Sequence, residues 1–168
     1  MKAKEEKEKE LAELVKEHNA SILRICKVYF PYDYYLRKDL YNEIVYRIWR
    51  GLNTFRNDSS VRTWIYKLSI NTAIELSQAE KRNRKKMEVL AELADRLSGE
   101  KDPLSDELYR MIDRLSSMEK AVIYMYLDRN PQSVIAETLG LTETNVSTMV
   151  GRIKLKLKKF KEDENANI

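Results

Sequence analysis

Apolar residues recur every three or four positions near the start of the chain, which predicts amphipathic helices. The first predicted helix carries its apolar stripe from Leu11 onwards and ends at Pro31. A second helix is expected over residues 38–52, where residues four apart form one apolar face: Leu40, Ile44, Ile48 and Leu52. Ser59 or Ser60 can cap a third helix that runs through Leu76 and toward the basic segment 81–86.

The second half of the chain repeats this helical pattern after a break. Segment 97–106 contains both Gly and Pro and is interpreted as a linker or its end. Another apolar stripe follows at Leu104, Leu108, Met111, Ile112 and Leu115. Residues 116–119, of sequence Ser-Ser-Met-Glu, resemble a helix cap, and the helix they begin continues through Leu127.

The pattern therefore predicts an all-α protein of two small helical domains joined by a linker. Helix-breaking residues are scarce, with 4 Gly and 3 Pro, which agrees with this fold class. A charged N-terminal helix or tail is expected at residues 1–17, followed by a first domain at residues 18–90. A linker at residues 91–106 then leads to a second domain at residues 107–161 and a tail at residues 162–168.

Composition excludes several kinds of function. The net charge of +4 is only a weak sign of a polyanionic partner. A single cysteine, Cys26, cannot form an intramolecular disulfide, and one histidine, His18, gives almost no support for a zinc site. We expect no metal, no cofactor and no catalytic residues. Nothing resembles an export signal or a membrane span, so a cytoplasmic location without membrane insertion is expected.

Residues 134–157 have the spacing of a helix-turn-helix. Small Ala136 would let two helices approach, Gly140 would permit a left-handed turn, and Thr142 would cap the second helix. The buried stripe of that helix would be Val146, Val150, Ile153, Leu157 and Phe160. Its outer face would then present to the DNA major groove Thr144, Asn145, Ser147, Thr148 and Arg152.

Lysines after this outer face could add phosphate contacts: Lys154, Lys156, Lys158, Lys159 and Lys161. The alternative interpretation of the helix-turn-helix pattern is two ordinary packed helices whose basic end is solvated.

Aromatic residues are crowded in the first half, with eleven of the fifteen between Tyr29 and Tyr66. Any one of them is better explained as core. Their neighbourhood also includes cations and an amide, notably Arg56, Lys67 and Asn71. Cations can neutralise the phosphate backbone of DNA, aromatic rings can stack on unpaired bases, and an amide can hydrogen-bond a base edge. This surface therefore suits single-stranded DNA.

These segments resemble a known family. Residues 39–75 look like region 2, and residues 115–157 like region 4, of bacterial sigma-70-type factors of the extracytoplasmic-function group. Together the segments cover about half of the chain in the expected order, with no middle domain between them. The resemblance implies a promoter-specificity subunit that binds core RNA polymerase and promoter DNA, often held by an anti-sigma factor.

The resemblance also implies site residues. Docking on the polymerase β′ clamp helices would use Asp39, Leu40, Asn42 and Glu43, with Asn42 standing where the family usually has Gln, and the β flap would be a further polymerase contact. Opening and reading the −10 element would use Asn53, Thr54, Phe55, Arg56, Ser60, Lys67 and Asn71. The helix-turn-helix would read the −35 element, although Ser147 and Met149 stand where basic residues are common.

Two other classes remain open from the sequence. A stand-alone helix-turn-helix regulator with an N-terminal partner-binding module would bind its promoter tightly without polymerase. An enzyme would need its carboxylates, such as Asp39 with Glu43, to join a nucleophile, a base and an orienting group, and no such set assembles.

Overall fold

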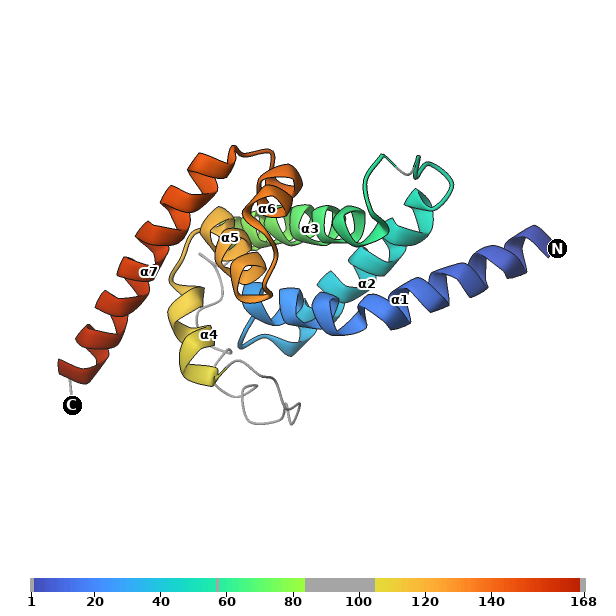
Figure 1. Cartoon of the computed structure of the whole chain (residues 1–168). Coiled ribbons are helices and arrows are strands. Elements are labelled where there is room, and N and C mark those ends of the chain that lie inside the picture. Colours follow the sequence, from blue (N-terminus) through green and yellow to red (C-terminus); the bar gives the residue numbers. More distant parts are fainter. Residues whose placement is uncertain (1, 57, 84–104, 167–168) are drawn as a thin grey trace. The chain divides into compact units, whose positions relative to one another are not determined.

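The computed structural model describes residues 2–56, 58–83 and 105–166, and every regular element in these ranges is an α-helix. The chain divides into two compact units, Met1–Arg96 and Leu97–Ile168 (Figure 1). The predicted all-α class is confirmed. The predicted linker 91–106 lies almost wholly outside the described residues.

The first unit packs three helices against one another, α1 (Lys2–Tyr29), α2 (Tyr34–Gly51) and α3 (Val61–Asn83). Their mutual contact buries an apolar core that includes Ile22, Ile25, Leu40, Ile44, Ile48 and Ile70. Cys26 is also buried there, and burial raises the pKa of its thiol to about 12. The thiol is therefore protonated at neutral pH and unreactive.

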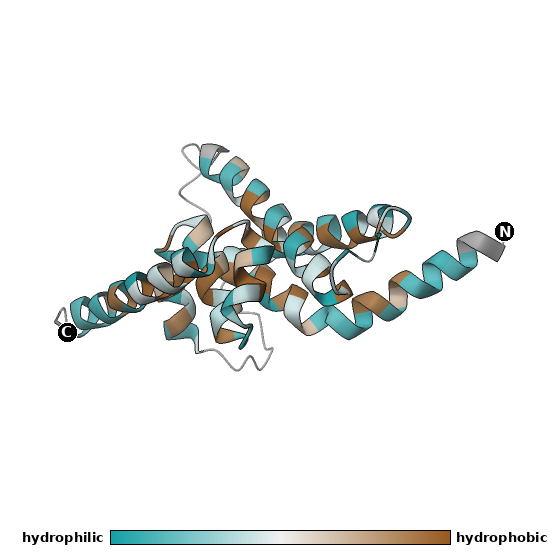
Figure 2. Ribbon diagram, turned by 45° about the horizontal axis from the view of Figure 1, so that its top comes forward, coloured by the Kyte–Doolittle hydropathy of each residue, from teal (hydrophilic) through white to brown (hydrophobic). Residues whose placement is uncertain are grey.

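Two helix ends differ from the sequence-based expectation. Helix α2 begins four residues earlier than expected, because the Asp33 carboxylate accepts a hydrogen bond from the Leu36 backbone N–H at 2.9 Å. Arg37 Nη1 also donates to the carbonyls of Phe30 and Pro31, at 3.2 and 2.6 Å, which ties the turn to α2. Helix α1 runs unbroken from Lys2 to Tyr29, so the boundary expected at residue 17 falls inside it. The ribbon near the N-terminus of α1 is mostly hydrophilic (Figure 2).

The second unit contains α4 (Asp106–Asp113), α5 (Ser117–Leu127), α6 (Gln132–Leu139) and α7 (Glu143–Ala166). Helix α7 contacts each of the other three, and α5 also contacts α6. The predicted cap at 116–119 is a complete capping box between Ser116 and Glu119. Gly140 has φ +66°, the left-handed conformation that the predicted turn requires.

No helix within the described ranges combines the length and apolar character needed to cross a membrane. Nor do the described residues gather three or more His, Cys, Asp or Glu side chains in a group that could hold a metal ion.

Candidate functional site

Helix α2 presents the first group of predicted site residues. Asp39 and Asn42 are exposed and Glu43 is half-buried, and their spacing puts them on one side of the helix. Leu40 points into the core and is completely buried, at 0% exposure. The prediction that Leu40 contacts a partner directly is therefore corrected. Its side chain packs in the core and supports α2 from within.

The exposed side of α2 continues beyond the predicted residues onto two aromatic rings. Tyr46 is 49% exposed and Trp49 is 40% exposed, and their rings stack with centroids 6.1 Å apart. Lys7 of α1 lies 4.5 Å from the centre of the Trp49 ring, and Arg50 lies 5.8 Å from that of Tyr46. From the sequence, any single aromatic residue is better explained as core, and only the packed structure separates these two from the buried ones.

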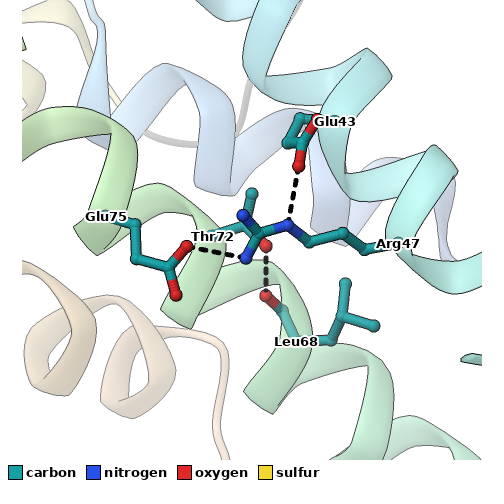
Figure 3. A network of polar contacts seen from close by, with 5 residues as sticks. All are labelled: Glu43, Arg47, Leu68, Thr72 and Glu75. Carbon is teal, nitrogen blue, oxygen red and sulfur yellow. Dashed lines mark hydrogen bonds and ion pairs between the residues drawn. The ribbon is translucent and has the colours of Figure 1, made fainter. Parts of the chain in front are cut away.

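Arg47 joins this surface to the next helix (Figure 3). Its Nε donates to Glu43 Oε1 at 2.8 Å, and its Nη1 lies 2.8 Å from Glu75 Oε2 on α3. The hydrogen bond that Arg47 donates to Glu43 is the largest cause of the raised pKa of Arg47, partly opposed by burial and reinforced by Glu75. Glu43 is thus already engaged within the unit, and the network fixes α2 against α3. In the same view the Thr72 hydroxyl donates to the Leu68 carbonyl at 2.7 Å.

The loop between α2 and α3, followed by α3 itself, carries the second group. Asn53, Thr54 and Arg56 are exposed and Phe55 is half-buried. Residue 57 lies outside the described residues. The Thr54 hydroxyl donates to the Gly51 carbonyl at 3.1 Å, so part of this loop is held by its own hydrogen bonds.

Ser60 is exposed but has a structural task, since its hydroxyl accepts from the Thr63 N–H at 3.1 Å and caps α3. Lys67 and Asn71 are exposed and lie one turn apart. Trp64 precedes Lys67 by three residues on the same side of α3, and its ring contacts that of Phe55 at 4.8 Å. The arrangement brings a ring pair, a cation and an amide onto one surface.

Helix α7 presents the third group. Val146, Val150 and Ile153 are buried, as the predicted stripe requires, whereas Leu157 and Phe160 are half-buried. Thr142 caps the helix by accepting from the Asn145 N–H at 3.1 Å. All five residues predicted for the outer face are exposed: Thr144, Asn145, Ser147, Thr148 and Arg152.

Two of the lysines that follow are engaged within the second unit. Lys154 Nζ donates to the Tyr126 hydroxyl at 2.7 Å, and Lys156 Nζ lies 2.6 Å from Glu119 Oε1. Lys158 and Lys161 make long contacts of 3.9 Å, to Glu162 and Glu107, and Lys159 is exposed. Sequence spacing could not reveal these pairs, because each partner of Lys154 and Lys156 comes from α5.

An ion pair of a buried lysine was also missed. Lys120 is 5% exposed, and its Nζ lies 2.7 Å from Asp113 Oδ1 at the end of α4. The pair joins the last residue of α4, whose side chain is 33% exposed, to the buried Lys120 of α5, and so constrains how α4 meets α5. A lone lysine in an apolar helix was the available signal.

Comparison with known protein families matches both units. The description "Sigma-70 region 2" matches residues 14–83, and "Sigma-70, region 4" matches residues 105–157. The chain is 27% identical over 161 residues to the RNA polymerase sigma-H factor of Pseudomonas aeruginosa, covering 89% of this chain and 81% of that protein.

Two solved structures share the fold. CnrH, solved in complex with the cytosolic domain of CnrY, matches with a TM-score of 0.68 and 16% identity, covering 93% of this chain and 90% of that one. The sigma factor RpoE of Bartonella quintana, solved with the anti-sigma factor NepR, matches with a TM-score of 0.68 and 14% identity, covering 92% and 96%.

Proposed function

Because the chain belongs to the sigma-70 family of RNA polymerase sigma factors, we propose that its two units hold one promoter at two places while core polymerase is bound. Its small size fits the extracytoplasmic-function type. The observation that carries the proposal is the correspondence between each matched region and one compact unit.

The exposed side of α2 is the proposed polymerase contact. Asp39 and Asn42 would contact the β′ clamp helices directly. The carboxylate of Glu43 would contact them while it accepts its hydrogen bond from Arg47. Leu40 would support them from the core. The β flap would be a further polymerase contact.

The loop of 53–56 together with the exposed side of α3 is the proposed −10 site. Unstacking and flipping a base costs a few kcal/mol. Stacking on an aromatic ring, worth roughly 1–3 kcal/mol per base, could offset that cost, and Phe55 supplies such a ring. Lys67 and Asn71 would contact the backbone and the base edge, and Ser60 would fix the start of the helix.

The outer side of α7 is the proposed −35 reader. Its exposed hydroxyl and amide side chains can reach base edges, and Arg152 can donate two hydrogen bonds to one guanine. Since Lys154 and Lys156 are held by α5, we expect the backbone contacts to come mainly from the more exposed lysines, Lys158, Lys159 and Lys161.

An anti-sigma factor is a further proposed partner. RpoE of Bartonella quintana was solved with the anti-sigma factor NepR, and CnrH with the cytosolic domain of CnrY. In this chain the stacked rings of Tyr46 and Trp49 provide exposed apolar area for a regulator that competes with polymerase. The proposed place of action is the cytoplasm, where polymerase works, and the protein itself would form and break no bond.

In vitro transcription with core polymerase over genomic DNA fragments tests this function. Adding the protein should produce new start sites, and the protein should co-purify with core enzyme. A preparation that yields neither would refute the proposal. A stand-alone regulator would instead bind the same fragments equally well without core enzyme, which a binding assay in both conditions distinguishes.

A further inference from the structure

Gly51, the last residue of α2, anchors the loop that carries the proposed −10 residues. Its carbonyl accepts three hydrogen bonds, from the backbone N–H of Thr54, the N–H of Phe55 and the Thr54 hydroxyl, at 3.0, 3.0 and 3.1 Å. These bonds fix the direction in which the chain leaves the helix, and hence where Phe55 lies.

The other side of Gly51 is pressed against Trp64 of α3. A Cβ added at Gly51 would lie 2.6 Å from Cζ2 of the Trp64 ring, closer than real contacts allow. Among the described residues a positive φ occurs only at Arg129 and Gly140, so the backbone of residue 51 does not itself require glycine. In a helix alanine is favoured over glycine by roughly 1 kcal/mol. The missing side chain therefore serves to admit the indole ring.

Trp64 in turn holds Phe55. The two ring centroids are 4.8 Å apart with a tilt of 31°, within the range of favourable aromatic pairs. Trp64 also shares the exposed side of α3 with Lys67 and Asn71, three and seven residues further on. One indole thus connects the end of α2, the loop and the proposed base-reading face of α3.

We infer that Gly51 and Trp64 are positioning residues for the −10 site: Gly51 leaves the space in which Trp64 lies, and Trp64 holds Phe55 beside Lys67 and Asn71. The inference rests on the proposed −10 role of this loop. An unpaired base entering the site would meet a ring whose place is fixed before DNA arrives, which removes the ordering cost from the moment of capture.

Gly51→Ala, Trp64→Phe and the double variant test this arrangement in reconstituted holoenzyme of the full-length chain. Opening is measured as permanganate reactivity of −10 thymines at a promoter found by the transcription experiment, and core binding is measured separately. Gly51→Ala should lower opening at least about fivefold, the lower end for one lost stacking contact, with core binding unchanged.

Trp64→Phe keeps a ring but lacks the outer indole atoms that the new methyl group would strike. In the Gly51→Ala background it should restore part of the lost opening, the non-additive result expected of two residues in direct contact. Gly51→Ala with undiminished opening, or two strictly additive effects, overturns the inference.

Thermal unfolding separates positioning from misfolding. Gly151→Ala makes the same change in α7, where nothing lies within 4 Å of the added Cβ, and serves as the stability control. If Gly51→Ala does not fold, Trp64→Leu carries the test: a folded variant must lose opening while binding core, and unchanged opening overturns the inference. If Asn71→Ala and Arg56→Ala also leave opening unchanged, the −10 assignment itself fails rather than the positioning role.

Discussion

Exposure differs sharply between neighbouring residues of α3, and this difference defines the proposed −10 surface. Asn71 and Lys67 are exposed, whereas Tyr66 and Ile70 beside them are buried, with only 2% and 0% of their surface exposed. A substitution at an exposed position can therefore remove a DNA contact without opening a cavity in the core. The same holds for Arg152 on α7, which lies next to the buried Ile153.

We predict that Asn71→Ala weakens promoter opening between about twofold and tenfold, because a neutral hydrogen bond contributes roughly 0.5–1.5 kcal/mol. Permanganate footprinting of reconstituted holoenzyme measures the effect, and core binding should be retained. Gln78→Ala, an exposed amide two turns further along the same side of α3, is the matched control. Equal losses of opening and core binding would contradict the assignment.

Arg152→Ala should weaken binding of holoenzyme to duplex containing the −35 element by ~1 to 3 kcal/mol if Arg152 contacts guanine with two hydrogen bonds. Competition binding against duplexes altered at single base pairs measures this and should show relaxed preference at one position. Arg110→Ala, at an exposed arginine of α4 outside the proposed surface, is the charge-matched control. A uniform loss across all sequences would instead indicate a phosphate contact.

A few polar side chains form hydrogen bonds or ion pairs within their own helix and also with a second helix. Glu119 Oε2 accepts from the Ser116 N–H at 2.9 Å and completes the cap of α5, while Oε1 accepts from Lys156 of α7 at 2.6 Å. Burial raises the pKa of this carboxyl, but the bonds from Lys156 and Ser116 outweigh it and leave the pKa lowered. The ionised carboxylate thus both begins α5 and holds α7 against it.

This contact predicts a pH dependence for the second unit. Because the folded pKa of Glu119 lies below the ordinary value of 4.5, its contribution is present above that pH and is lost as the pH falls through the folded pKa. Urea unfolding from about pH 6 down to about pH 3 should show the loss, and Glu119→Gln should reduce this dependence. Glu137→Gln, at an exposed position of α6, should leave it intact.

Each of the two units has an apolar core of its own, and substitutions should act within one unit. Leu40 and Ile112 are both completely buried, the first in the unit of α1 to α3 and the second in the unit of α4 to α7. Two small cores allow each unit to keep its own contact surface.

Leu40→Ala should destabilise the first unit by ~2 to 5 kcal/mol through the cavity it leaves. Hydrogen exchange should accelerate at amides within 2–83 and stay unchanged within 105–166, while Ile112→Ala should give the reverse. Weak core binding by Leu40→Ala should recover at lower temperature, where the unit is folded. Lost binding in a fully folded variant would restore Leu40 as a direct contact.

Local patterns in the sequence predicted much of this protein correctly. The helices follow from apolar spacing, the start of α5 from Ser116 and Glu119, and the turn before α7 from Gly140. Each of these features depends on residues within about four positions of one another, so the sequence alone contains the necessary information. The family resemblance followed from the same segments and was confirmed by the two matched regions.

The tertiary structure decided which side chains within those segments are available. Leu40 is buried although it stands in the proposed polymerase-binding motif, Lys154 and Lys156 are held by α5, and Arg47 joins α2 to α3. The partners that Lys154, Lys156 and Arg47 find on a second helix lie 28 or more residues away in the chain, and helical periodicity does not identify them. The sequence therefore determined the helices and the family, whereas packing between helices determined which residues can meet polymerase and DNA.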